Sequence, residues 1–454
     1  MLSRPGGHAR SSLFRAVIAI AVGATLVGPA ASASALTPVG AVSTSSVAAA
    51  PDTSQSGYWY YQDYGVAEAA AEGFDGSGVK IAVIDSQINP DVEQFSTAKL
   101  TVREPSFCAD FDSIDEYESA ATTSYDDGYH GNDMVGLIAG NGVGDDGQAA
   151  QLGVAQGADV TFYSALLTLQ KGSLYCSPLG DRDGNRDEGF AQAIETAIDD
   201  GNDIIVIAIP NGGGDELIYA AVARAVRENV VIVAARSNTT TTGGSTELFN
   251  MNGVVTVQAM DRKGTLQAAS TVADPRIDVV GPGVGILGNS GSFSTFDETS
   301  GTSNAAAITA GFLAVVKSKY PDADGSQLIQ SLIRNTGVND HELTYDPQNF
   351  IGYGAVSLSH MLANDPTRYE SVNPLLDPSD SDRPSKVEIY GSATAAPGNP
   401  ATDPDADGDP AGVAGFSIPH LIVGGVIGLL VLIGIIVLVI VLVRRSARTA
   451  PGAP

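Results

Sequence analysis

The sequence predicts a doubly wound α/β fold with a mainly parallel sheet, followed by one C-terminal transmembrane helix. Between residues 58 and 364, short apolar runs alternate with helical patterns, which is typical of parallel βαβ units. Asp85 and Asn238 each lie just past the end of such a run, where open α/β sheets bind their ligands. A stretch of 23 uncharged residues, 421–443, lies near the C-terminus.

The N-terminal region has the pattern of a secretory signal peptide over residues 1–35. Three arginines precede the apolar run 16–27, and small residues that suit a cleavage site follow it. The alternative is an uncleaved membrane anchor, but the run is short for a bilayer span. The small and Ser/Thr-rich residues 36–57 predict a loosely ordered extension.

The predicted elements of the globular segment follow from hydrophobic periodicity. The continuous apolar runs that indicate buried strands are 79–84, 204–209, 230–235, 254–259 and 277–280. The helical patterns are 188–199, 220–227 and 303–319.

The composition changes after residue 364. Pro, Asp, Ser, Gly and Ala dominate 365–419, which predicts a flexible or extended stalk. The segment 420–443 is long enough to cross about 30 Å of hydrocarbon, although a buried core helix is the alternative. Arginines begin the tail 444–454, and aspartates lie before the apolar segment. By the positive-inside rule we expect the tail in the cytoplasm and the residues before the span outside it. The chain is thus expected to be a single-pass protein of the cell membrane.

The charge balance narrows the classes of partner. The formal net charge is −28, from 52 acidic and 24 basic residues, and such a surface repels nucleic acid. The acidic run 403–409 has the spacing of a calcium loop, but Ala414 stands where an EF-hand needs Glu. A solvated acidic linker is therefore favoured, and the sequence predicts no metal site and no cofactor.

Cys108 and Cys176 are the two cysteines of the chain. Outside the cytoplasm, two cysteines predict one disulfide. By the loop-entropy model, such a bridge would stabilise the folded state by about 4 kcal/mol. Two free buried thiols are the alternative. Their loops flank motifs of the predicted site, and we expect the disulfide to join these loops beside the cleft.

Three separated motifs together suggest a nucleophilic serine. They are 81–86 with Asp85, 129–136 with His130, and 300–306 with Ser303. A Ser hydroxyl is a weak nucleophile unless an imidazole takes its proton and a carboxylate orients that imidazole. No other His lies between the signal and residue 340, so His130 is the leading candidate for the base. A structural role is the alternative for a lone His.

These motifs resemble those of the subtilisin-like serine proteases, in the order Asp, His, Ser. The framework segments 153–158, 277–284 and 352–354 are also similar, so the resemblance spans about 57–360. It implies a subtilisin-like fold and hydrolysis of peptide bonds in protein or peptide substrates. The implied roles are Asp85 as orienting carboxylate, His130 as general base and then acid, and Ser303 as nucleophile.

The resemblance also implies an oxyanion hole and a substrate strand. Asn238 lies in a turn after a strand, and its side-chain amide would donate to the oxyanion together with the Ser303 N–H. The alternative is that Asn238 is only a turn residue. Ala208, Ile209 and Pro210 stand where the family pairs with substrate backbone. Because Pro has no N–H, we expect weak or narrow peptide binding.

Several family residues are replaced here. The departures are Gln87, Asn132, Asp133, Arg236, Ser237 and Ala307. Because of these replacements, a loss of peptidase activity stays an alternative.

The layout of signal, protease-like segment, stalk, span and basic tail resembles the mycosins, membrane-anchored proteases associated with type VII secretion systems. This resemblance implies partners in a secretion membrane complex. Three hypotheses follow: an active membrane-anchored endopeptidase, an inactive structural subunit of a secretion complex, and a generic surface binding module. The joint presence of Asp85, His130, Asn238 and Ser303 favours the first.

Overall fold

The structure is a computed structural model that describes most of the segment between residues 56 and 391. The described residues are 53, 56–109, 115–168, 174–176, 186–209, 215–238, 248–267, 276–377, 379 and 382–391. The predicted signal, membrane span and cytoplasmic tail lie outside them. Within the described ranges, no helix combines the length and the apolar character that a bilayer crossing needs.

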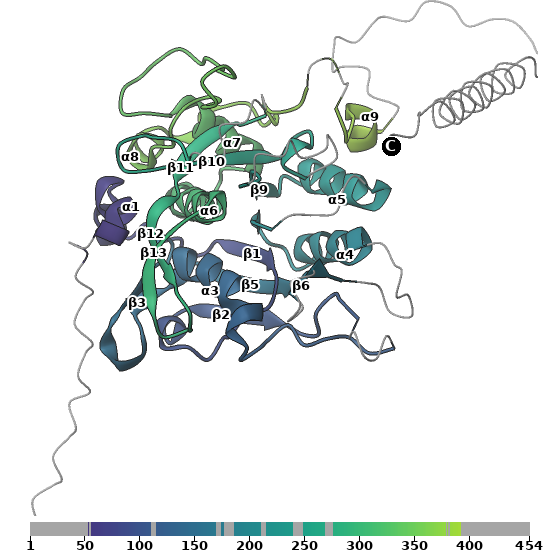
Figure 1. Ribbon diagram of the computed structural model, residues 1–454. Coiled ribbons are helices and arrows are strands. Elements are labelled where there is room, and N and C mark those ends of the chain that lie inside the picture. The colour runs from purple at the N-terminus through teal and green to yellow at the C-terminus, as the bar shows by residue number, and fades with distance from the viewer. Residues whose placement is uncertain are drawn as a thin grey trace, which may run out of the picture. The chain divides into compact units, whose positions relative to one another are not determined.

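A seven-stranded parallel sheet forms the centre of the molecule, with the order β11-β10-β9-β8-β1-β5-β2 (Figure 1). The strands are β1 Lys80–Asp85, β2 Lys99–Arg103, β5 Asp159–Ser164, β8 Ile204–Ile207, β9 Val231–Ala235, β10 Val255–Met260 and β11 Val279–Pro282. The predicted doubly wound parallel sheet is confirmed. The strand order reverses between β1 and β8, so the ends of these two strands flank the point where such sheets bind ligands.

The central strands are buried on both faces, which explains their continuous apolar runs. In β1, Ile81 and Val83 pack into the core that includes α3 and α6, whereas Ala82 and Ile84 pack into the core that includes α4 and α5. Figure 1 shows these helix pairs on opposite sides of the sheet. The layers are therefore helix, sheet, helix.

Helices α4, α5 and α6 match the three predicted patterns, and the described residues form further helices, of which α3 with 15 residues is the longest. The helices are α1 Trp59–Asp63, α2 Val66–Ala71, α3 Tyr125–Ala139, α4 Arg186–Asp199, α5 Glu216–Arg227, α6 Thr302–Lys319, α7 Gly325–Arg334, α8 Leu358–Ala363 and α9 Lys386–Tyr390. The first fifteen residues of α6, 302–316, are all buried, so this helix lies in the middle of the core.

Three two-stranded ribbons complete the strands of the described residues. They are β3 Asn141–Val143 with β4 Ala149–Leu152, β6 Leu167–Thr168 with β7 Leu174–Tyr175, and β12 Val284–Asn289 with β13 Phe296–Ser300. The β12–β13 hairpin is antiparallel and runs directly into the segment before α6.

The folded part extends beyond residue 364, where the sequence predicts a stalk. Asn373 Nδ2 donates to the Gly253 carbonyl at 2.9 Å, and Arg383 forms a bidentate pair with Glu216. Ile389 is buried against α5. The prediction of a stalk from residue 365 is therefore wrong for 365–377 and 382–391, because this acidic, Pro-containing segment carries enough apolar and amide side chains to pack on the domain.

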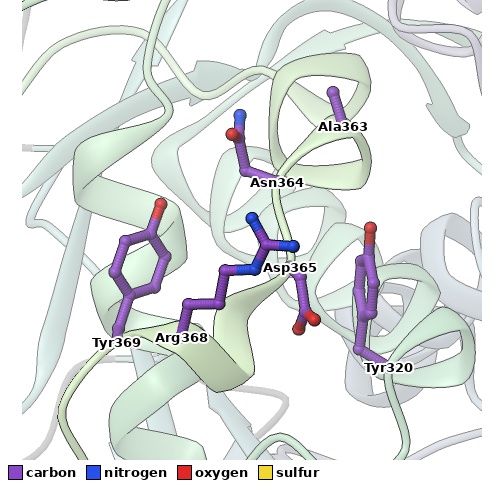
Figure 2. A pocket seen from close by; sticks show the side chains of 6 residues that line it. All are labelled: Tyr320, Ala363, Asn364, Asp365, Arg368 and Tyr369. Atoms are coloured by element: carbon purple, nitrogen blue, oxygen red, sulfur yellow. The ribbon is translucent and has the colours of Figure 1, made fainter.

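The start of this segment also forms a surface pocket of about 360 Å³ (Figure 2). Its lining residues are Tyr320, Ala363, Asn364, Asp365, Arg368 and Tyr369. Figure 2 shows the Arg368 side chain between the two tyrosine rings. Asp365, Arg368 and Tyr369 are thus part of the wall of this pocket.

Candidate active site

Asp85 and His130 are in direct contact at the carboxyl edge of the sheet. Asp85 is the last residue of β1 and is fully buried, and its two carboxylate oxygens lie 2.8 and 2.9 Å from His130 Nδ1. A carboxylate only accepts hydrogen bonds, so Nδ1 carries the proton and Nε2 is left as the basic nitrogen. The Ser86 N–H also donates to Asp85, at 2.7 Å, which fixes the carboxylate.

Four effects act on the pKa of His130. Burial disfavours the charged ring and would lower the pKa. The charge of Asp85, its hydrogen bond and the charge of Asp133 together outweigh burial, so the pKa is raised above its usual value. The imidazole is therefore a stronger base than a free histidine side chain.

Ser303 lies in the first turn of α6, nearly buried, beside the end of β8. Its hydroxyl donates to the Ala208 carbonyl at 3.0 Å. Among the described residues, no hydrogen bond joins this hydroxyl to His130. The fold thus brings the predicted serine to the switch point, with its hydroxyl turned toward β8.

The Asn238 side chain is held with its oxygen toward α6. Its Oδ1 accepts from the Thr302 N–H at 3.0 Å and the Thr302 hydroxyl at 3.1 Å, so Nδ2 faces the other way as a donor. A Cβ added to Gly301 would lie 3.7 Å from both Asn238 Nδ2 and the Ser303 backbone N. The two N–H groups predicted as oxyanion donors therefore border the same small space.

The predicted substrate strand is only partly described. Ala208 follows β8 directly, and its carbonyl accepts the Ser303 hydroxyl. Ile209 packs against the core on the α4–α5 side. Pro210 lies outside the described residues.

The disulfide between Cys108 and Cys176 is confirmed. The N–H of Phe107, next to the first cysteine, donates to the Ser164 carbonyl at 2.8 Å. Ser164 ends β5 and pairs in register with Asp85. The bridge therefore joins two loops at the same sheet edge as the Asp–His pair.

Two residues of the His130 helix have structural roles that the motif did not reveal. The Asn132 amide accepts from the Asn89 N–H at 2.7 Å and donates to the Asn89 carbonyl at 3.0 Å, which ties the loop after β1 to α3. Asp133 Oδ1 accepts two hydrogen bonds from Asn289. Both residues appeared in the sequence only as replacements of the usual Thr and His.

Within the part of the chain that the structure describes, no group of three or more His, Cys, Asp or Glu side chains is arranged to hold a metal ion. No ligand set for calcium or another metal is therefore assigned.

Comparison with known proteins gives a consistent result. The model of the subtilase family, Peptidase S8, matches residues 76–354. The chain is 29% identical over 284 residues to a thermostable alkaline protease of Halalkalibacterium halodurans, covering 62% of this chain and 68% of that protein. It is 26% identical to subtilisin DY of Bacillus licheniformis, covering 63% of this chain and 93% of that protein.

Two solved structures share the fold. Fervidolysin from Fervidobacterium pennivorans, a keratinolytic enzyme related to subtilisin, has a TM-score of 0.52 at 24% identity, covering 69% of this chain and 47% of that chain. A protease from Pseudoalteromonas arctica has a TM-score of 0.52 at 20% identity, covering 69% of this chain and 98% of that chain.

Proposed function

This chain belongs to the subtilase family of serine proteases, and from that premise we propose that it cleaves peptide bonds of proteins through an acyl-enzyme on Ser303. The observation that carries the proposal is the hydrogen bond between Asp85 and His130 Nδ1 at 2.8 Å. In the neutral imidazole this bond holds the proton on Nδ1, so Nε2 is the nitrogen that can accept a proton as a general base.

The first half of the reaction forms the acyl-enzyme. His130 Nε2 takes the proton from Ser303 Oγ as that oxygen attacks the scissile carbonyl carbon. The carbonyl oxygen becomes an oxyanion that accepts from Asn238 Nδ2 and the Ser303 N–H. When the tetrahedral intermediate collapses, the C–N bond breaks and the protonated His130 gives its proton to the leaving amine.

The second half releases the acid product. A water molecule occupies the place of the amine, His130 removes its proton, and the resulting hydroxide attacks the ester carbon. The ester C–O bond breaks and His130 returns the proton to Ser303 Oγ. The enzyme ends in its starting protonation state.

Substrate binding offers a way to turn the Ser303 hydroxyl toward the base. In the free protein this hydroxyl donates to the Ala208 carbonyl. A peptide lying along the end of β8 presents an N–H to the same carbonyl and displaces the hydroxyl. A neutral hydrogen bond of this kind contributes only about 1 kcal/mol, so the exchange requires little free energy.

Hydrolysis of dye-quenched casein by the wild type and by Ser303→Ala tests this function. We expect the substitution to abolish cleavage while the thermal unfolding midpoint stays close to that of the wild type. Ser331→Ala is the matched control, because Ser331 is a buried helical serine on α7. The proposal fails if a folded wild type shows no Ser303-dependent cleavage.

We also propose that the protease domain lies outside the cell membrane, anchored by the single apolar segment 420–443. The support is in the sequence, where aspartates precede this segment and arginines follow it. Deleting 420–454 should move the protein from the membrane fraction to the medium. Retention in the membrane fraction would contradict the anchor.

The layout of the sequence supports a role in type VII secretion, either as a protease or as a structural subunit. One observation favours the structural alternative. Among the described residues, the Ser303 hydroxyl donates its hydrogen bond to the Ala208 carbonyl and not to His130. Complementation of a secretion-deficient deletion strain separates the two. Rescue by Ser303→Ala would indicate a structural role, and failure of a stably expressed Ser303→Ala would indicate a proteolytic one.

A further inference from the structure

A buried carboxylate, Asp133, joins the two parts of the chain that carry His130 and Ser303. Asp133 lies three residues after His130 on α3 and is 6% exposed. Its Oδ1 accepts from the Asn289 N–H at 2.8 Å and from Asn289 Nδ2 at 2.7 Å. Asn289 ends β12, whose partner strand β13 ends at Ser300, three residues before Ser303.

The close approach of the hairpin to Asp133 is built into the sequence. A Cβ added to Gly288 would lie 3.1 Å from Asp133 Oδ2 and 2.7 Å from Thr299 Oγ1. A side chain at this position would push the hairpin away from the helix. Gly288 therefore permits the short contact between Asp133 and the neighbouring Asn289.

A second anchor lies on the other side of His130 along the helix. The Tyr125 hydroxyl donates to the Asn289 carbonyl at 3.2 Å and accepts from the Gly291 N–H at 2.8 Å. The ring of Phe293, at the tip of the hairpin, packs edge-on against Tyr125 with centroids 5.6 Å apart. The turn that carries His130 is thus held between two contacts to one hairpin. Figure 1 shows this β12–β13 hairpin beside α3.

We propose that Asp133 is a positioning residue for the proposed peptidase reaction. It holds the helix of His130 against the hairpin that leads into Ser303, and it adds a second carboxylate charge near the imidazole. This inference rests on the proposed function only for its kinetic readout, since the contacts and the charge act on His130 whatever the substrate.

The titration of Asp133 is coupled to that of His130. Burial raises the pKa of Asp133 to about 6, and the two Asn289 hydrogen bonds and the charge of His130 oppose that rise. The charge of Asp133 in turn raises the pKa of His130, as does that of Asp85. Above pH 6 the carboxylate is mainly ionised, so at neutral pH it favours the protonated imidazole.

The other groups around this pair are few. Tyr125 and Tyr129, from the same helix, have pKa values that the charge of Asp133 helps to raise, although burial is the larger cause. Asp85 from β1 faces His130 directly. The hairpin contributes the uncharged Asn289, and β4 contributes Gln151, whose Nε2 donates to the Asp133 backbone carbonyl at 3.2 Å.

Two substitutions separate the mechanical effect from the charge effect. Asp133→Asn keeps an oxygen for the Asn289 donors but removes the charge, and Asp133→Ala removes both. We expect Asp133→Ala to lower kcat on dye-quenched casein about 10- to 100-fold with a smaller change in KM, because misplaced reacting groups cost chiefly turnover. Asp133→Asn should restore most of kcat and move the acidic limb of kcat/KM to lower pH.

Asp278→Asn is the matched control. Asp278 is a partly buried carboxylate whose pKa desolvation raises to about 7, and its Oδ2 accepts the Thr256 N–H at 2.7 Å. It makes no described hydrogen bond to α3 or to the β12–β13 hairpin. Its substitution should leave the acidic limb where it is. Should Asp133→Ala fail to fold, Asn289→Ala serves as the milder break of the same anchor, with a smaller loss of kcat.

An NMR titration of the His130 ring in the full-length, ¹⁵N-histidine-labelled chain completes the test. Asp133→Asn should lower the pKa of His130 even if the chain cleaves no casein, so failure of the proposed function and failure of this inference give different results. An unchanged His130 titration in Asp133→Asn would overturn the charge role. An unchanged kcat in Asp133→Ala, or in Asn289→Ala if Asp133→Ala does not fold, would overturn the positioning role.

Discussion

The carboxylate of Asp85 determines which nitrogen of His130 can act as a base. Because both carboxylate oxygens face Nδ1, the proton stays on that nitrogen. Asp85→Asn would present an amide N–H to the ring and favour the wrong tautomer. We expect kcat to fall by about 10³–10⁴-fold with little change in the thermal midpoint. Retained turnover would show that the carboxylate does not orient the base.

The pH dependence of activity follows from the pKa of His130. The base must be neutral, so kcat/KM rises as pH increases through the pKa of the folded protein. Since Asp85 and Asp133 raise that pKa above 6.5, the midpoint of the acidic limb should lie above 6.5. A profile of kcat/KM between pH 5 and 9 measures it, and a midpoint below 6.5 would contradict the described electrostatics.

At the residue scale, the sequence predicted the groups whose roles depend on local motifs. Asp85 and His130 lie together as predicted, and Asn238 and Ser303 meet beside Gly301. The partners of Asn132 and Asp133 were not predictable, because Asn89 and Asn289 are 43 and 156 residues away in the chain. Only the fold reveals such pairs.

At the element scale, helix α3 is positioned by polar contacts as well as by its apolar face. Asn132 is fully buried and satisfies both backbone groups of Asn89. Asn132→Ala leaves these groups unpaired, at a cost of about 1–3 kcal/mol in the free energy of unfolding. Urea unfolding measures the loss. Asn141→Ala, which removes a partly exposed amide on β3, is the control and should lose less.

The elements that the sequence predicted are those with a clear hydrophobic pattern, either a continuous apolar run or a helical period. Strands β1, β8, β9, β10 and β11 are buried on both faces and read as continuous apolar runs. The edge strand β2 has charged residues at both ends, and β13 reads Phe-Asp-Glu-Thr-Ser, so neither has the pattern of a buried strand. The hairpin that leads to Ser303 was therefore missed.

At the scale of the whole molecule, the folded unit ends later than composition suggests. The described residues of this segment contact α5 through Arg383 and Ile389 and the loop before β10 through Asn373. They contact α7 through the Thr367 carbonyl, which accepts from Gln327 Nε2 at 3.3 Å. A chain truncated after Gly391 should keep the thermal midpoint of the wild type. A chain truncated after Asn364 should unfold at a lower temperature, and equal midpoints would show that the segment adds no stability.

The proposed reaction depends above all on Ser303 being the nucleophile that His130 activates. The most direct measurement is peptide mapping by mass spectrometry after treating the full-length chain with a fluorophosphonate. We expect a single phosphonate adduct on Ser303 that is absent in Ser303→Ala and strongly slowed in Asp85→Asn. A folded wild type without an adduct on Ser303, or with an adduct on another residue, would contradict it.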